Sequence, residues 1–200
     1  MQVIEISGSG WPELSALWRR QWPECPPLAH ELKNVYADRW VRFHSLPGSQ
    51  RYADDESEYA ILLHRHNTVL NEFFTGQRVH IVTAPYGARE ETVEISMAGV
   101  PHVLNPDSHP WTTLGEEGPD TDRIVHLHVS GRPWLPGTID PLLRAVADDQ
   151  CSDVIIMDTA LRRLYHPYDG GADCIVESTA ERDRLKAAHS DWLSRHPRGL

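Results

Sequence analysis

Residues 153–177, DVIIMDTALRRLYHPYDGGADCIVE, alternate between short apolar runs and turn-forming residues. This pattern predicts three short strands, at 153–158, 162–166 and 172–177, joined by tight turns. Ser178 and Glu181 follow with the S-x-x-E spacing of a capping box, so a final helix is expected to begin there. We therefore expect the carboxyl-terminal part of the chain to be a β-meander followed by a helix.

The rest of the chain mixes helical and strand patterns without the regular alternation that builds a parallel sheet. Apolar spacing and capping residues predict helices at 11–21 and 138–148, a long helix from 54 to 73, and one or two helical turns at 28–35. Alternating segments predict strands at 40–46, 78–83, 92–97 and 123–129.

Residues 99–122 are rich in proline, glycine, aspartate and serine, which predicts a long ordered loop anchored by Trp111. No segment has the composition of an interdomain linker. The sequence therefore predicts one α+β domain over residues 1–200, with a mixed or mostly antiparallel sheet and three to four helices.

The composition limits the class of protein and its partners. The 200 residues carry a formal net charge of −10, which makes duplex nucleic acid a poor partner because its affinity comes largely from neutralised phosphates. A protein partner with a basic surface suits this charge. No apolar run approaches the roughly 20 residues that cross a bilayer, and the three cysteines lack metal-site spacing. We expect a cytoplasmic protein that does not associate with membranes.

Common cofactor and catalytic motifs do not occur in the sequence. It contains neither G-x-x-x-x-G-K-[ST] nor G-x-G-x-x-G, and neither G-x-S-x-G nor H-E-x-x-H. Lys33 and Lys186 are the only lysines, and both fall at surface positions of expected helices. We therefore expect no cofactor, and lysine-dependent chemistry is disfavoured.

The segment RWVRFHS at 39–45 is one candidate ligand site. If it forms a strand, Arg42 and His44 share a face, and Arg51 returns toward them through the following turn. Forked N–H groups of arginine suit a phosphate or a carboxylate. The interpretation that we favour is that these arginines pair with the acidic residues at 54–58, which requires no ligand.

The segment YHPYDGGAD at 165–173 is a second candidate. It places the acid/base pair His166 and Asp169 beside the phenol of Tyr165 and the carboxylate of Asp173. The same residues also describe a structural turn, in which Asp169 caps the bend and the glycines take positive φ. We favour the structural interpretation of this turn.

Other histidines offer weaker hypotheses. His126 and His128 lie two apart in an expected strand, so their rings point to one face, and a zinc site there would require a further ligand. Without an identifiable third ligand, we expect no metal. Cys25 and His30 would make a thiol and a base, but nothing in the neighbouring sequence orients His30.

Residues 39–74, RWVRFHSLPGSQRYADDESEYAILLHRHNTVLNEFF, and 164–197, LYHPYDGGADCIVESTAERDRLKAAHSDWLSRHP, together resemble an uncharacterised bacterial family of unknown function. The family is marked by the Y-H-P-Y-D turn before a short strand and a final helix. The resemblance leaves residues 85–135 unsupported. It implies a soluble bacterial α+β domain and assigns no catalytic residue.

Two functions follow as hypotheses. The favoured one is a protein-binding or regulatory module, such as a toxin-neutralising protein, that uses an acidic surface and a tryptophan-rich periphery. It predicts that an acidic surface patch with aromatic side chains coincides with the loop at 99–122. The alternative is a hydrolase or phosphate-ester enzyme with an Arg/His cluster. It requires the two candidate segments to meet in one cleft and at least one histidine there to have a shifted pKa.

Overall fold

The structure is a computed structural model that describes residues 2–7, 10–88, 100–117 and 123–194. Its strands are β1 (Gln2–Ser7), β2 (Trp40–His44), β3 (Arg78–Thr83), β4 (Tyr86–Ala88), β5 (His109–Glu117), β6 (Arg123–Pro133), β7 (Ile155–Asp158), β8 (Leu164–Tyr168) and β9 (Gly171–Ile175). Its α-helices are α1 (Pro12–Gln21), α2 (Ala29–Val35), α3 (Glu56–Phe74), α5 (Val100–Leu104), α6 (Asp140–Ala147) and α7 (Thr179–Ala188). Three short 3₁₀ helices are η1 (Ala37–Arg39), η2 (Pro47–Ser49) and η3 (Ser190–Trp192).

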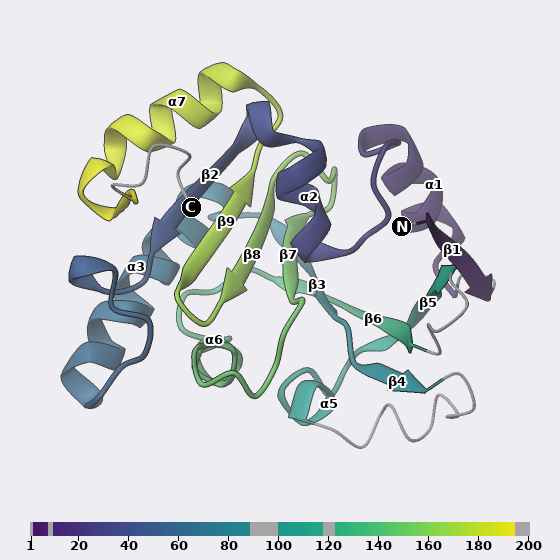
Figure 1. Ribbon diagram of the computed structural model, residues 1–200, viewed down its shortest axis with the longest axis horizontal. Coiled ribbons are helices and arrows are strands. Elements are labelled where there is room, and N and C mark those ends of the chain that lie inside the picture. Colours follow the sequence, from purple (N-terminus) through teal and green to yellow (C-terminus); the bar gives the residue numbers. More distant parts are fainter. Residues whose placement is uncertain (1, 8–9, 89–99, 118–122, 195–200) are drawn as a thin grey trace.

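The strands of the described part form one sheet, in the order β1-β5-β6-β3-β7-β8-β9-β2, and β4 adds to β6 outside this path. Every strand pair is antiparallel. Figure 1 shows α2 lying across the part of the sheet formed by β7, β8 and β9. The fold brings β2, from the first quarter of the chain, to the edge of the carboxyl-terminal strands.

The sheet separates two apolar layers, because successive side chains of a strand point to opposite faces. On one face, Phe73 of α3 and Leu142 of α6 pack in the same cluster as Cys174 of β9. On the other face, Leu32 of α2 packs in the same cluster as Ile175 of β9. Full burial of such a side chain contributes about 1.5–3 kcal/mol, so these layers account for much of the stability of the fold.

Local capping signals act at the ends of α3 and at the start of α7, whereas α1, α2 and α6 begin without a side-chain cap. The Asp55 side chain accepts hydrogen bonds from the backbone N–H groups of Ser57 and Glu58 at the start of α3. Gly76, just after α3, has a φ of 75°, the left-handed conformation expected of a glycine there. The Ser178 hydroxyl caps α7 by accepting from the Glu181 N–H. These features confirm the predicted end of α3 and the predicted start of α7, whereas α3 begins two residues later than predicted, at Glu56.

The α+β class and the antiparallel sheet are confirmed, but three to four helices is too few, since the described residues contain six α-helices. The predicted meander is matched in part. Its strands β7, β8 and β9 are successive neighbours, but their bounds differ from the predicted ones and β2 continues the sheet beyond β9.

The predicted loop at 99–122 is wrong. Residues 100–104 form α5 and residues 109–117 form β5, which pairs with both β1 and β6. Strand pairing overrides the weak local preference of this proline-rich and glycine-rich segment. Residues 105–108 connect α5 and β5, whereas residues 99 and 118–122 of the predicted loop and the predicted strand at 92–97 lie outside the described residues.

The tryptophan-rich periphery is also wrong. Trp18, Trp22, Trp111 and Trp134 are buried, and the other three tryptophans are half-buried. Trp111 is 1% exposed and its indole N–H donates to the Ser15 hydroxyl at 2.8 Å.

Within the described ranges, no helix has both the length and the apolar character to cross a membrane.

Candidate functional site

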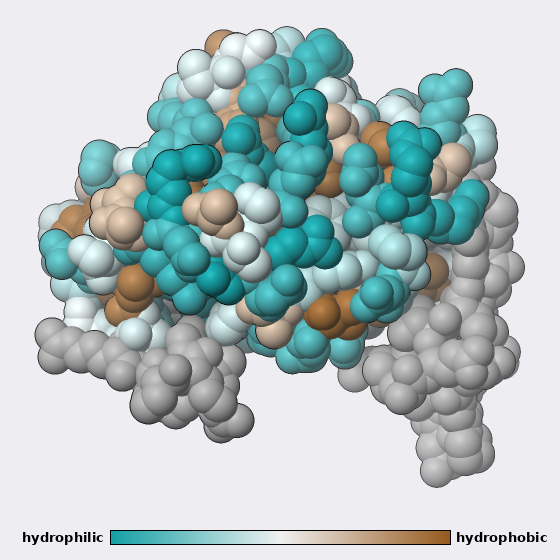
Figure 2. Space-filling model, turned by 90° about the horizontal axis from the view of Figure 1, so that it is seen from above, coloured by the Kyte–Doolittle hydropathy of each residue, from teal (hydrophilic) through white to brown (hydrophobic). Residues whose placement is uncertain are grey.

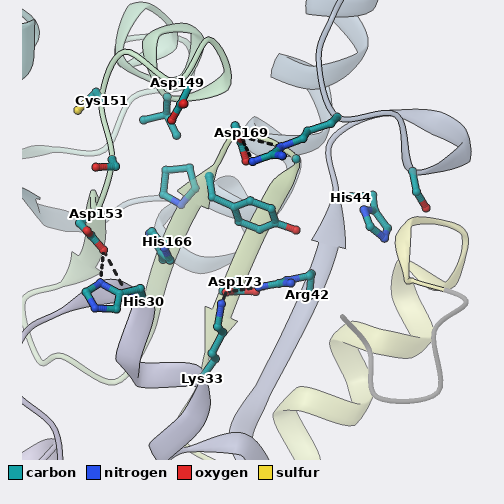
Figure 3. Close-up of a pocket in the computed structure, with 17 residues that line it drawn as sticks. His30, Lys33, Arg42, His44, Asp149, Cys151, Asp153, His166, Asp169 and Asp173 are labelled. Atoms are coloured by element: carbon teal, nitrogen blue, oxygen red, sulfur yellow. Dashed lines mark hydrogen bonds and ion pairs between the residues drawn. The ribbon is translucent and has the colours of Figure 1, made fainter. Parts of the chain in front are cut away.

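A cavity of about 520 Å³ opens where β2, β8 and β9 meet α2 and the segment between α6 and β7 (Figure 3). This volume falls in the range typical of small-molecule sites. Its walls carry an unusual number of ionisable side chains: His30, Lys33, Arg42, His44, Arg51, Asp149, Cys151, Asp153, His166, Tyr168, Asp169 and Asp173. The cavity is therefore suited to a polar or charged ligand.

Three of these side chains form a row across neighbouring strands. Arg42 of β2 lies directly opposite Asp173 of β9, and Asp173 lies directly opposite His166 of β8. Residues directly opposite one another in a sheet project from the same face. The pairing of the strands therefore brings a guanidinium, a carboxylate and an imidazole to one wall of the cavity.

The carboxylate of Asp173 holds Arg42 in place. Arg42 donates from Nε to Oδ1 at 2.7 Å and from Nη2 to Oδ2 at 2.9 Å. Its guanidinium also lies 4.7 Å from the centre of the Tyr168 ring, and Lys33 Nζ lies 4.0 Å from Asp173 Oδ2. This pair uses two of the five N–H donors of arginine. A fixed guanidinium beside a lysine can recognise an anionic group.

His166 is positioned as a proton acceptor. Its side chain is largely buried, and Nδ1 lies 2.9 Å from the Val154 carbonyl oxygen. Because a carbonyl only accepts, Nδ1 carries the proton and Nε2 of the neutral ring carries the lone pair. Burial lowers the pKa of His166 and outweighs the opposing effects of Asp173 and Asp153. The neutral ring is therefore the prevailing form at neutral pH.

A second histidine, in the first turn of α2, is held by a carboxylate. His30 Nδ1 lies 2.8 Å from Asp153 Oδ1, and the Tyr86 hydroxyl donates to Asp153 Oδ2 at 2.5 Å. The hydrogen bond to Asp153 raises the pKa of His30. Burial alone would raise the pKa of Asp153, but the hydrogen bonds from His30 and Tyr86 lower it to about 2. Asp153 also adopts a left-handed φ of 52°, a strained conformation that is common at functional sites.

The turn between β8 and β9 forms another wall. Arg51 donates from Nε to Asp169 Oδ2 at 2.7 Å, and the Tyr52 hydroxyl donates to the same oxygen at 3.1 Å. Neither Gly170 nor Gly171 has positive φ, so that part of the structural interpretation is wrong. Gly171 is required for another reason, because a Cβ atom there would lie 2.1 Å from the Phe43 carbonyl oxygen.

Six of the seven candidate ligand residues line this cavity: Arg42, His44, Arg51, His166, Asp169 and Asp173. Tyr165 does not, since its side chain lies in the apolar layer on the opposite face and its hydroxyl bonds to His66 Nδ1 at 2.7 Å. The expectation that the arginines pair with the acidic residues at 54–58 is wrong. Glu56 pairs with Arg144, and Glu58 accepts from Gln50.

Sequence reasoning missed three charged residues of the cavity, namely Lys33, Asp149 and Asp153, and it considered His30 only as a base for Cys25. Asp153 supplies the orienting group that the neighbouring sequence of His30 lacks, from 123 positions away. Cys25 is buried, and burial raises the pKa of its thiol to about 12, so it is not a nucleophile paired with His30. The scarcity of lysine was the one signal that singled out Lys33.

His126 and His128 share one face of β6 and are buried there. His126 Nδ1 lies 3.1 Å from the Thr113 hydroxyl. Burial lowers the pKa of His128, which favours its neutral ring. Among the residues that the structure describes, no group of three histidine, cysteine, aspartate or glutamate side chains could hold a metal ion.

The fold and the cavity define an α+β protein with a polar, histidine-containing pocket on one face of an antiparallel sheet. The chain belongs to the family described as a domain of unknown function (DUF3885), whose model matches residues 28–197. The match includes every residue that lines the cavity and leaves out β1 and α1. Comparisons with curated proteins and with solved structures found no match.

Proposed function

We propose that the protein is a hydrolase that acts on phosphate esters in this cavity. The observation that carries the proposal is the meeting of two segments about 120 positions apart, one with Arg42 and Arg51, the other with His166 and Asp173. A site for phosphate-ester hydrolysis requires positive charge that binds the phosphate and a neutral histidine that can accept a proton. Both are present in one pocket of ligand size.

The residues divide the chemistry between them. Lys33 and the free N–H groups of Arg42 bind the phosphate oxygens and offset the charge that develops on them. The oxygen of a water molecule bonds to phosphorus while its proton passes to His166 Nε2. The bond between phosphorus and the alcohol oxygen breaks, and that oxygen takes the proton back from His166. The products are the free alcohol and inorganic phosphate.

A protein-binding role remains a second proposal, because the net charge of −10 suits a basic partner. Its other supports are weaker. The tryptophans are not exposed, and Figure 2 shows a face on which hydrophilic side chains predominate and apolar ones are scattered. The cavity favours the enzyme.

We also propose that the protein works in the cytoplasm. Cys25, Cys151 and Cys174 are all free and buried. Free thiols are typical of proteins in reducing compartments, where disulfides are rare.

The test is hydrolysis of a chromogenic phosphate monoester by the wild-type chain and by His166→Ala. Loss of a general base lowers kcat by about 10²–10⁴-fold. His64→Ala is the matched control, because His64 is exposed on α3 and outside the cavity; it should retain full activity. Absence of hydrolysis by the wild-type chain across phosphate monoesters and diesters would overturn the proposal, as would equal activity of His166→Ala.

A further inference from the structure

The charges of the cavity are divided between its two ends. At one end, the two cations Lys33 and Arg42 surround the single carboxylate of Asp173. At the other end, the single cation Arg51 pairs with Asp169, and Asp149 lines the same part of the cavity. Figure 3 shows Lys33 and Asp149 at opposite ends, with His166 between them. One end thus has an excess positive charge and the other an excess negative charge.

The surroundings reinforce this division. Asp149 lies two residues after Ala147, the last residue of α6, so the carbonyl groups at the end of that helix add negative potential near it. Near Lys33, His30 and Asp153 form a pair that is neutral overall when the imidazole is protonated. His44 lines the cavity beside Arg42, and burial lowers its pKa, so it adds no charge at neutral pH.

A ligand gains most from such a cavity when its own charges have the complementary arrangement. A ligand with an anionic group at each end, long enough to span the cavity, would place one of these groups next to Asp149 and Asp169. The like charges would repel each other. A ligand with one acidic group and one protonated amine meets an opposite charge at each end. Between these ends it passes His166, a largely buried polar side chain that lines the cavity.

We infer that the cavity binds a zwitterion, whose acidic group lies at Lys33 and Arg42 and whose ammonium group lies at Asp149 and Asp169. The inference rests on the proposed function and specifies its substrates as phosphate esters of amino alcohols. The ammonium group selects the ligand, while the phosphate is the reacting group. Asp149 is thus a specificity-determining residue with no part in proton transfer.

The test compares two probes that differ by one amine, O-phosphoethanolamine and ethyl phosphate, by isothermal titration calorimetry of His166→Ala, which does not hydrolyse them during the titration. We expect this variant to bind O-phosphoethanolamine about tenfold more tightly, as one additional complementary charge pair allows. Adding Asp149→Asn should abolish this preference by weakening the binding of O-phosphoethanolamine. Asp148→Asn is the control, because Asp148 is the neighbouring exposed carboxylate but does not line the cavity.

The outcomes separate this inference from the proposed function. Equal binding of the two probes, or a preference that survives Asp149→Asn, would overturn the inference that the ligand is a zwitterion. Neither result would affect the proposed hydrolase activity. A preference for O-phosphoethanolamine that depends on Asp149, without hydrolysis, supports the ligand class and overturns the hydrolase. Failure of both probes to bind overturns the inference about the ligand, and the proposed hydrolase is overturned as well if the wild-type chain hydrolyses no phosphate monoester or diester.

Discussion

Arg42 and Asp173 lie directly opposite each other on β2 and β9 and form two parallel hydrogen bonds, of 2.7 and 2.9 Å. The carboxylate is 1% exposed, so it has almost no access to water in place of the guanidinium. The ion pair therefore fixes the edge strand β2 to β9 and presents Arg42 to the cavity with one orientation.

Arg42→Met should lower the free energy of unfolding by about 3 kcal/mol, because it leaves a buried carboxylate without its partner. Urea denaturation measures this change. The double variant Arg42→Met/Asp173→Leu should recover part of the loss, since it removes the unpaired charge. A single variant as stable as the wild type would show that the pair contributes nothing to the fold.

Gly171→Ala should lower the free energy of unfolding by at least the roughly 1–3 kcal/mol that is typical of overpacking. A Cβ atom there would lie 2.1 Å from a backbone oxygen of β2, which cannot move without breaking the strand pairing. Gly131→Ala is the control, since its Cβ atom would make an ordinary contact of 3.5 Å with His80. Thermal unfolding of the two variants should differ clearly. Similar melting temperatures would contradict the predicted collision.

His30→Gln should lower the free energy of unfolding by about 1 kcal/mol, the upper end of the range for a partly exposed ion pair. The size of this loss should depend on pH. The pKa of Asp153 in the folded protein is lowered from 3.8 to about 2. The stabilisation that the Asp153 carboxylate contributes is therefore fully present above pH 3.8 and is lost as the pH falls toward 2. The folded pKa of His30 is raised above 6.5, so its contribution is present below 6.5 and is lost as the pH rises through the raised value.

The stability difference between wild type and His30→Gln should therefore be largest between about pH 4 and 6.5. Urea midpoints measured across that range and on either side of it test this window. A difference that does not change with pH would mean that the two residues are not coupled as an ion pair.

The buried His66 should make the protein sensitive to acid. Burial lowers its pKa from 6.5 to about 4, so between these values the unfolded chain binds a proton that the folded chain does not. Stability should fall by on the order of 3 kcal/mol as the pH drops through this range. His66→Gln removes the titration and should flatten the dependence, whereas His64→Gln, at an exposed position, should leave it unchanged. An equally steep dependence in His66→Gln would refute the assignment.

The rate of the proposed hydrolysis should rise with pH as His166 loses its proton. Burial lowers the pKa of this group, so kcat/KM should increase along an acidic limb centred below pH 6.5 and be flat near neutrality. The Val154 carbonyl fixes the tautomer through a backbone atom, so side-chain substitutions at 154 should leave the limb in place. A limb centred well above 6.5 would point to another base.

The sequence by itself determined the class of fold and most of its local structure. Turn residues and alternation in 153–177 predicted three carboxyl-terminal strands, and the capping box that begins at Ser178 predicted the start of α7, because both signals act within a few residues. Alternation also placed Arg42 and His44 on one face of β2. These features depend on neighbouring residues alone, so they are readable without a structure.

Only the tertiary structure decided that the candidate segments form a cavity and which side chains complete it. Asp173 rather than the acids at 54–58 pairs with Arg42 because β2 joins the sheet beside β9. Asp153 orients His30 because α2 crosses that face of the sheet. Such contacts join residues more than 100 positions apart, and no local pattern specifies them.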